Sequence, residues 1–435
     1  MRADQKRSQM ISFSDVLARV KNVAPRPRGS PIQIYIHIPF CTSKCHFCDY
    51  VVGNSTRQLT APRAAQVRYV DALCRQIRTI GPCLMELEYV PTSIYWGGGT
   101  PTKLVPEELA RIGSALKDSF DLSSLQQHSV EVSPETFCVD HIGAMSMAPF
   151  DRISIGVQSL QPHHLQRAGR AHSAEQAVAA VEVARHGGIT NINIDLISGF
   201  PGEQIEEMFD SASRAAMLGV QHISVYPYRP SPGTRMASQI DSGRREPLKL
   251  EYMKSSYLCA KETLEKNGFD QYALSYFAKS EEYRSKVSMH IYNLEGDIIG
   301  FGSGGHSILG WHRVLNDNGF YDRYIDDPLS FDKCVKFGTE PDQIESLLLR
   351  VGAALQTQGG LNFQRFASLT GHSFQKLRRE NDATIGFLHH LRLCGAKFVE
   401  FDDRFVMESE NVHDVYLEHI NMLVKYGKLD RGLRV

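Results

Sequence analysis

Three closely spaced cysteines are the residues with the most specific chemistry in this sequence. Cys41, Cys45 and Cys48 form a C-x3-C-x2-C run directly after the apolar segment QIYIHIPF. Three thiolates can ligate three irons of a [4Fe–4S] cluster and leave the fourth iron for an exogenous ligand. A zinc site needs a fourth protein ligand, for which His37 and His46 are candidates. His46 lies inside the tight loop beside Cys45, an awkward position for the same metal, so the cluster is favoured over zinc and over coincidence.

Two glycine-rich segments are the next candidates for contact with a ligand. Gly97–Gly99 end the strand-like run TSIYWGGG, and Gly300–Gly304 lie in GFGSGGHS. Glycine lets the backbone approach a ligand closely and expose its N–H donors, so a carboxylate or an amino-acid moiety would suit the first segment. Strand-end turns often carry glycines for structural reasons, and each segment alone is weak evidence.

Several charged or polar residues stand at or near the ends of strand-like runs. Glu131 and Asp195 lie among apolar neighbours in VEVSPET and INIDLISGF, where a buried acid usually has a partner or a task. Glu131 could hold an ammonium group on the inner face of a barrel, whereas Glu135 fits a solvated loop better. Gln158 ends another strand, and Arg170 could grip a carboxylate, although a surface arginine beside a helix start is an equally good interpretation.

The elements that must position these residues alternate between strands and helices. Runs rich in Ile, Val and Tyr predict strands at 33–40, 92–99, 128–134, 152–159, 191–199 and 222–228. Amphipathic patterns predict helices at 64–77, 106–120, 173–187 and 204–219, the third with a capping box of Ser173 and Gln176. Six such units predict an α/β fold, a partial (β/α)6 TIM-like barrel whose chemistry collects at the carboxyl ends of its strands.

We expect three regions along the chain. Residues 1–30 form a polar, irregular lead-in, and residues 31–310 form the barrel, with a further helix at 247–267. Residues 311–435 form a small, mainly helical domain that covers the open side of the barrel, with a hairpin at 397–407.

Composition indicates an ordinary globular enzyme. The 435 residues are 42% hydrophobic and 22% charged, with a formal net charge of −1, which argues against a nucleic-acid or membrane-surface binder. The sequence has no apolar run of transmembrane length and no secretory h-region at its start. The six dispersed cysteines read as buried thiols of a reducing cytoplasm, so we expect a cytoplasmic protein.

Taken together, the motifs resemble those of the radical S-adenosylmethionine (SAM) superfamily. The residues concerned are Y-x-H-x-P-F-C-x3-C-x-F-C, GGGTPT, E-x-x-P-E, S-I-G-V-Q-S, R-x-H-S and G-x-G-S-G-x-H-S, in order between about 33 and 310. The more similar subfamily is the one related to the oxygen-independent coproporphyrinogen III oxidase. The resemblance implies a cluster on Cys41, Cys45 and Cys48, with its open iron chelated by SAM and its electron supplied by a donor such as flavodoxin or ferredoxin.

The resemblance also implies further binding residues. One SAM would contact the first glycine turn and the polar strand ends, at Phe47, Gly98, Gly99, Thr100, Glu131, Gln158, Arg170 and Asp195. Some members of the subfamily bind a second SAM, whose matching positions here are Tyr35, Gly300, Phe301 and Gly302.

Departures from the pattern distinguish among the relatives. Coproporphyrinogen oxidases carry an additional cysteine two residues after the triplet, where this chain has Tyr50. Haem-chaperone relatives carry H-N-x-x-Y-W before the second glycine segment, where this chain reads HIYNLE from His290. The run CTSKCHFCDYVV is instead similar to class C radical SAM methylases and cyclopropane-forming enzymes of natural-product pathways.

The favoured prediction is therefore methyl or methylene transfer from a second SAM to an sp2 carbon, for example of a peptide thiazole. Tyr35, His37 and His306 are candidate proton relays, although such histidines are more often structural. A tetrapyrrole enzyme, either coproporphyrinogen oxidase-like or haem-degrading with methyl transfer, and a haem chaperone are the alternatives. The sequence does not identify the substrate.

Overall fold

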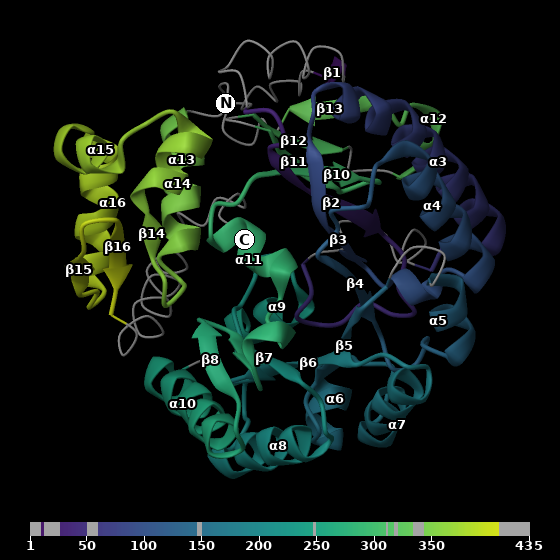
Figure 1. Cartoon of the computed structure of the whole chain (residues 1–435). Coiled ribbons are helices and arrows are strands. Elements are labelled where there is room, and N and C mark those ends of the chain that lie inside the picture. Colours follow the sequence, from purple (N-terminus) through teal and green to yellow (C-terminus); the bar gives the residue numbers. More distant parts are fainter. Residues whose placement is uncertain are drawn as a thin grey trace, which may run out of the picture.

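A single large sheet organises the chain in the computed structural model, which describes residues 10–12, 27–49, 60–145, 150–246, 249–309, 312–316, 321–333 and 343–408. Within these residues the sheet has 13 strands in the order β1-β13-β12-β11-β10-β2-β3-β4-β5-β6-β7-β9-β8. The strands from β10 to β7 are parallel, and those on both flanks are antiparallel. The parallel strands are β10 (Asp297–Phe301), β2 (Pro31–Ile38), β3 (Val90–Gly98), β4 (Gln127–Val132), β5 (Arg152–Gln158), β6 (Asn191–Ser198) and β7 (His222–Pro227). The curved sheet confirms the predicted α/β partial barrel (Figure 1).

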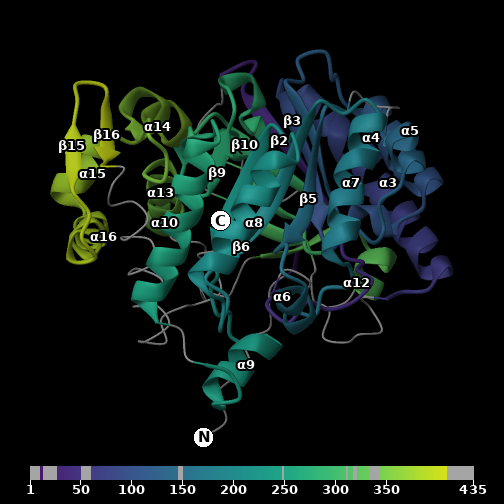
Figure 2. The ribbon, with the colours of Figure 1, turned by 90° about the horizontal axis from the view of Figure 1, so that it is seen from below.

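Helices cover the outer face of this sheet, as Figures 1 and 2 show. The longer ones are α3 (Arg63–Glu86), α4 (Pro106–Ser119), α7 (Ala174–His186), α8 (Ile205–Met217) and α10 (Leu250–Lys266). The shorter helices of this region are α5 (Val139–Met145), α6 (Pro162–Arg167), α9 (Arg235–Asp241), α11 (Lys286–Tyr292) and α12 (Tyr321–Asp326), of which α9 and α11 lie inside the ring of outer helices in Figure 1. The predicted capping box is present, because Ser173 accepts from the amide of Gln176 and Gln176 accepts from the amide of Ser173.

The alternation of side chains along β2 separates the core from the site. Ile32, Ile34, Ile36 and Ile38 are fully buried in the main core, which they share with residues of the outer helices. Because successive side chains of a strand point to opposite faces, Gln33, Tyr35 and His37 face the interior of the barrel. The outer face therefore contributes the apolar core, and the inner face presents the polar groups.

The flanks of the sheet differ from the predicted regions. β1 (Met10–Ser12), inside the predicted irregular lead-in, pairs with β13 (Ser330–Lys333). β12 (His312–Asn316) and β13 lie beyond residue 310, yet they continue the same sheet through β11 (His306–Leu309). These short strands pair with the backbone N–H and C=O groups that β10 would otherwise leave exposed at its edge. They have too few residues to show the alternation of apolar and polar side chains that predicts a strand. At the other edge, β9 (Tyr276–Ala278) and β8 (Asp270–Ala273) follow β7.

The C-terminal residues form a mainly helical unit with its own core. It comprises α13 (Gln343–Ala354), α14 (Phe363–Thr370), α15 (Phe374–Glu380) and α16 (Asp382–Leu393), with a sheet of β14 (Leu361–Asn362), β16 (Arg404–Met407) and β15 (Phe398–Glu400). The predicted hairpin is β15–β16. Leu274 and Leu294 of the barrel join this core, so the unit packs at the edge formed by β8 and α11. Among the described residues, no helix is long and apolar enough to span a bilayer.

Candidate cluster and SAM site

The three predicted cluster ligands lie together in the loop that follows β2. Cys41, Cys45 and Cys48 are half-buried and take part in no disulfide among the described residues. Ligand atoms around a tetrahedral zinc lie about 3.8 Å apart for thiolates, given Zn–S bonds of about 2.3 Å. The thiols do not form such a group, since among the described residues only one set of three ligand atoms, elsewhere in the chain, lies within 4.8 Å of one another. Three separate irons of one cluster fit the wider spacing of these thiols better than a single ion does.

The contacts of His46 also disfavour zinc. Its Nδ1 lies 2.8 Å from the Arg167 carbonyl oxygen, and its Nε2 lies 3.0 Å from Nη1 of Arg235. Both ring nitrogens are therefore occupied by other parts of the chain. The ring instead fastens the loop to the end of α6, where the His46 amide also donates to the Ala168 carbonyl oxygen at 2.8 Å.

Arg170 contacts a predicted cluster ligand. Its Nη1 lies 3.1 Å from the Cys45 sulfur, while Nη2 donates to the Gly156 carbonyl oxygen at 2.7 Å and to the Ser133 hydroxyl at 3.1 Å. Burial raises the pKa of the neighbouring Cys41 thiol to about 12, and the Arg170 guanidinium opposes this shift. The predicted contact of Arg170 with SAM stays a prediction, and its contact with the loop was not foreseen.

The first glycine turn is packed against the cluster loop. The amides of Gly99 and Thr100 each donate at 2.7 Å, to the carbonyl oxygens of Ile38 and Phe40. A Cβ at Gly98, which has φ of 106°, would lie 2.5 Å from the His37 ring, and one at Gly99 would lie 2.5 Å from the Phe40 carbonyl oxygen. The glycines thus allow close approach to the protein's own groups. Thr100, whose hydroxyl lies 3.8 Å from the Cys41 sulfur, reaches the predicted ligands directly.

Glu131 is a half-buried residue whose carboxyl group lies beside this turn. It accepts a hydrogen bond from the Tyr95 hydroxyl, and a Cβ at Gly97 would lie 3.0 Å from its carboxyl carbon. Burial raises the pKa of Glu131 to about 7, with Asp195 adding to the shift and hydrogen bonds from Tyr95 and the Gly98 amide opposing it. A cation beside this group would stabilise its charged form, which is what the ammonium group of SAM would do. The residues therefore fit the amino-acid part of SAM.

Asp195 and Gln158 lie on neighbouring strands of the inner face. Asp195 accepts from Ser154 and Asn193, both at 2.8 Å, and burial raises its pKa despite these bonds. Gln158 has a left-handed backbone with φ of 70°, and the register shifts between Gly156 and Gln158. Such strain at the carboxyl end of β5 is typical of functional sites.

Glu135 is not the solvated loop acid that the sequence indicated. Its carboxylate accepts from Ser133 at 2.5 Å and lies 3.5 Å from Nδ1 of His172. Burial alone would raise its pKa, but His172, Ser133 and the nearby Arg170 lower it to about 2. The sequence could have indicated this role through R-x-H-S, whose arginine and histidine both lie beside this acid.

Backbone amides of the second glycine segment already donate hydrogen bonds to other groups of the protein. The amides of Gly300, Gly302 and Ser303 donate at 2.9 Å to Ser307, Gln76 and Tyr69, respectively. Phe301 is fully buried in the main core, with its ring 6.1 Å from that of Phe120. These three amides and the Phe301 side chain therefore serve the fold, and a second SAM at this segment stays a prediction.

The candidate relay residues cluster at the mouth of the barrel. The Tyr35 hydroxyl lies 2.9 Å from Nδ1 of His37, and the rings of Tyr35 and His306 are 5.8 Å apart. Burial, with a smaller contribution from His306, lowers the pKa of His37 to about 3, so His37 is neutral. Phe47 lies on another side of the loop, with its ring 5.8 Å from that of Phe200.

Comparison with known proteins agrees with this geometry. A family model described as the radical SAM superfamily matches residues 35–215 of this chain. Two haem chaperones named HemW are similar: that of Bacillus subtilis is 31% identical over 79% of this chain and 88% of its own length, and that of Mycobacterium tuberculosis is 28% identical over 78% and 86%. The chain belongs to the HemN/HemW family of radical SAM proteins.

Two further relatives connect the chain to HemN. The oxygen-independent coproporphyrinogen III oxidase of Bradyrhizobium diazoefficiens is 31% identical over 59% of this chain and 55% of its own length. The structure of coproporphyrinogen III oxidase HemN from Escherichia coli shares the fold, with a TM-score of 0.70 and 21% identity over 93% of this chain and 92% of that one. The predicted similarity to class C methylases is not confirmed by these relatives.

Proposed function

We propose that this chain is a radical SAM enzyme that acts on a tetrapyrrole. The names of its relatives support the substrate class, because they are haem chaperones and coproporphyrinogen oxidases. The enzymatic part of the proposal rests on Glu131, a half-buried residue near the end of β4 whose carboxyl group lies beside the glycine turn that contacts the cluster loop. A cluster and SAM, when bound, would supply one-electron reductive cleavage of SAM.

His290 favours an enzyme over a haem chaperone. It occupies the histidine position of the motif that the chaperone relatives carry, yet it is only 1% exposed. Its Nε2 lies 2.9 Å from the Asp297 carbonyl oxygen, and its Nδ1 lies 3.9 Å from the Glu295 carboxylate. The ring is thus held within the fold, and haem ligation through Nε2 would require it to leave the Asp297 carbonyl oxygen.

The chain's own residues would bind and orient the reactants. Cys41, Cys45 and Cys48 would hold the cluster, and Glu131 would hold the ammonium group of SAM. His37 is neutral with a pKa of about 3, so it can hold the Tyr35 hydroxyl in place but is a poor proton acceptor. The helices around the sheet would exclude water from this interior.

Methyl or methylene transfer is the second candidate function. It is favoured by the sequence after Cys48, where Tyr50 stands in place of the additional cysteine of the oxidases. Tyr50 lies outside the described residues. This function needs a second SAM, and because the amides of Gly300, Gly302 and Ser303 are already paired, other groups would have to bind it.

The test is SAM turnover by the anaerobically reconstituted protein with a reductant. We expect 5′-deoxyadenosine and methionine to form faster when coproporphyrinogen III or haem is added, as measured by mass spectrometry. A stable haem complex without SAM turnover would instead support a chaperone. Deuterium from methyl-labelled SAM in a product that is not a tetrapyrrole would support the second candidate.

Two cysteine variants provide the matched comparison. Cys48→Ala removes a predicted cluster ligand and should abolish turnover. Cys83→Ala removes a half-buried thiol of α3 that lies 3.4 Å from the Thr79 carbonyl oxygen, and turnover should be unchanged. Equal activity of the two variants would contradict the assigned cluster ligands.

A further inference from the structure

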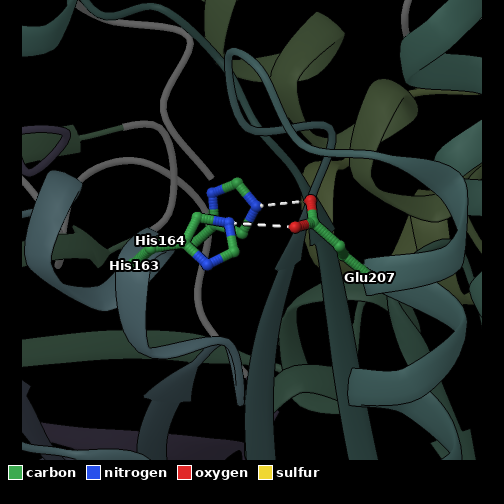
Figure 3. Close-up of side chains that lie close together, drawn as sticks. All are labelled: His163, His164 and Glu207. Atoms are coloured by element: carbon green, nitrogen blue, oxygen red, sulfur yellow. Dashed lines mark hydrogen bonds and ion pairs between the residues drawn. The ribbon is translucent and has the colours of Figure 1, made fainter.

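Two adjacent histidines and a glutamate form a compact group on the outer layer of the barrel. His163 and His164 lie in α6, and Glu207 lies in the first turn of α8 (Figure 3). Nε2 of His163 is 3.0 Å from one carboxylate oxygen of Glu207, and Nε2 of His164 is 2.9 Å from the other. Among the described residues, this is the one group of three metal-ligating side chains whose ligand atoms lie within 4.8 Å of one another.

The spacing of these atoms approaches that of ligands around one small ion. Ligands at about 2.0 Å from a tetrahedral zinc lie about 3.3 Å from one another. The nitrogen–oxygen distances of 2.9 and 3.0 Å, measured to the two different oxygens of Glu207, are a few tenths of an ångström shorter than this, and all three ligand atoms lie within 4.8 Å of one another. The two ring centres are 4.1 Å apart, and the Nε2 atoms of these adjacent helical residues face the two oxygens of one carboxylate (Figure 3).

The group is buried and held by hydrogen bonds on one side and faces solvent on the other. The His164 side chain is 2% exposed, and Glu207 accepts a hydrogen bond from the Gln204 amide at 2.7 Å as part of the α8 capping box. The His163 side chain is 49% exposed, which leaves room for water ligands and a path of entry.

We propose that His163, His164 and Glu207 form a binding site for a divalent transition-metal ion, with zinc as the expected occupant. Two imidazoles and one carboxylate are a typical ligand set for zinc, and water can complete the coordination. The set lacks the additional carboxylates and carbonyls that Ca²⁺ and Mg²⁺ prefer. This site is separate from the cysteine loop and does not depend on the proposed function.

An ion at this site would fix α6 in place beside the cluster loop. It would join α6 to α8, and the far end of α6 carries the Arg167 carbonyl oxygen that contacts the ring of His46. His164 also stacks on Phe200, with the ring centres 6.4 Å apart, and Phe200 contacts Phe47, the residue before Cys48. The ion would therefore have a structural role: it would stabilise the position of α6 and, through the contacts of α6 and Phe200, that of the cysteine loop.

Zinc binding by the full-length, cluster-containing protein tests the proposal. After anaerobic reconstitution and removal of loose metal with a chelator, zinc chloride is added and excess is removed. We expect about one zinc per chain without loss of iron, and zinc-edge X-ray absorption should show nitrogen and oxygen ligands only. No retained zinc, or a sulfur shell around it, would overturn the proposal, because sulfur ligation would place the ion at cysteines.

Variants at the site separate a specific site from surface binding. His163→Ala removes an exposed ligand and should weaken zinc binding at least about tenfold in calorimetry. Glu207→Gln keeps an oxygen that can accept the hydrogen bond of the capping box. This variant should weaken zinc binding by a similar factor. His186→Ala removes an exposed histidine of α7 whose Nδ1 lies 2.8 Å from the Glu182 carbonyl oxygen, and zinc binding should not change. Equal affinity of His163→Ala and the unaltered protein would refute the assignment.

Discussion

At the scale of single residues, Glu131 should affect both the pH dependence of stability and the binding of SAM. Its pKa in the folded state is about 7, above the ordinary value of 4.5. Between these two pH values the folded chain binds more protons than the unfolded chain, so the free energy of unfolding falls as pH rises through this window. Glu131→Gln removes this group, and denaturant unfolding of the cluster-free protein at pH 5 and pH 8 should show a smaller fall. The same variant should weaken SAM binding at least about tenfold, since a neutral amide replaces a charge-assisted partner of the ammonium group.

Glu203 provides the control for this prediction. Burial also raises its pKa to about 7, with hydrogen bonds from the Gly199 amide and Ser256 opposing the shift. Glu203→Gln should reduce the pH dependence of stability in the same direction while SAM affinity, measured by equilibrium binding, stays within about twofold. If both variants lost SAM binding equally, Glu131 would have no special role in holding SAM.

Arg170 should affect the potential and assembly of the cluster through its hydrogen bond to Cys45 more than through the packing of its side chain. Its Nη1 is 3.1 Å from the Cys45 sulfur, and donors to ligand sulfurs stabilise the more negative, reduced state of a cluster. Arg170→Met keeps an apolar chain of similar length, and we expect a lower midpoint potential and less iron after reconstitution. The midpoint potential and iron content of Arg170→Lys should lie between those of Arg170→Met and the unaltered protein. An unchanged potential in Arg170→Met, measured by redox titration followed by electron paramagnetic resonance, would show that the contact has no electronic effect.

At the scale of elements, the glycine turn after β3 should tolerate no side chain. Gly98 has φ of 106°, and a Cβ would lie 2.5 Å from the His37 ring, so Gly98→Ala adds backbone strain to a steric overlap. We expect it to lower the free energy of unfolding by about 2 kcal/mol or more. Gly386→Ala in α16 is the matched control, because no atom lies within 4 Å of its added Cβ, and it should be neutral or stabilising by up to about 1 kcal/mol. Chemical denaturation of both variants compares them, and similar stability would contradict the strain argument.

The parallel strands and their helices were predictable from the sequence because each repeats a local pattern. β2, for example, places four isoleucines at alternate positions and ends before Pro39. β1, β12 and β13 were not predictable, because strands of three to five residues gain their stability from neighbours that are distant in the sequence. The pairing of Met10 with Asp332 is such a contact, and no local pattern encodes it.

The candidate site was predictable in its residue types but only partly in its contacts. The cysteine triplet was found from its C-x3-C-x2-C spacing, and Glu131 was found because a charged residue in an apolar strand is conspicuous. The contact of Arg170 with Cys45 spans 125 residues, so only the fold brings the two together. The glycines were interpreted as a ligand cradle, whereas their neighbours in the structure are His37, Glu131 and Phe40. A glycine requirement in the sequence does not reveal which group comes close.

At the scale of the whole molecule, the C-terminal unit is joined to the barrel by a mixed apolar and polar contact. Leu274 and Leu294 lie in the core of the C-terminal unit, and the Leu274 amide donates to the Gln356 carbonyl oxygen at 3.0 Å. Arg350 of α13 lies 3.5 Å from the carboxylate of Asp297, which is 1% exposed at the start of β10. Since β10 pairs directly with β2, this contact connects the C-terminal unit to the strand that carries the cysteine loop.

Removing the cation from this contact should destabilise the whole protein. Arg350→Met leaves the buried carboxylate of Asp297 without Arg350, although the Tyr89 hydroxyl still donates to it at 2.8 Å. Losing one partner of a buried pair typically costs about 3 kcal/mol, so we expect a lower midpoint of denaturation and faster proteolysis of the C-terminal unit. Adding Asp297→Asn to Arg350→Met should recover part of the loss, because the uncompensated charge disappears. Lys376→Ala is the control: its contact with Glu380, at 3.8 Å, is exposed and should change stability by less than about 0.5 kcal/mol. If the double variant were no more stable than Arg350→Met, the loss would come from packing of the arginine chain and not from its charge.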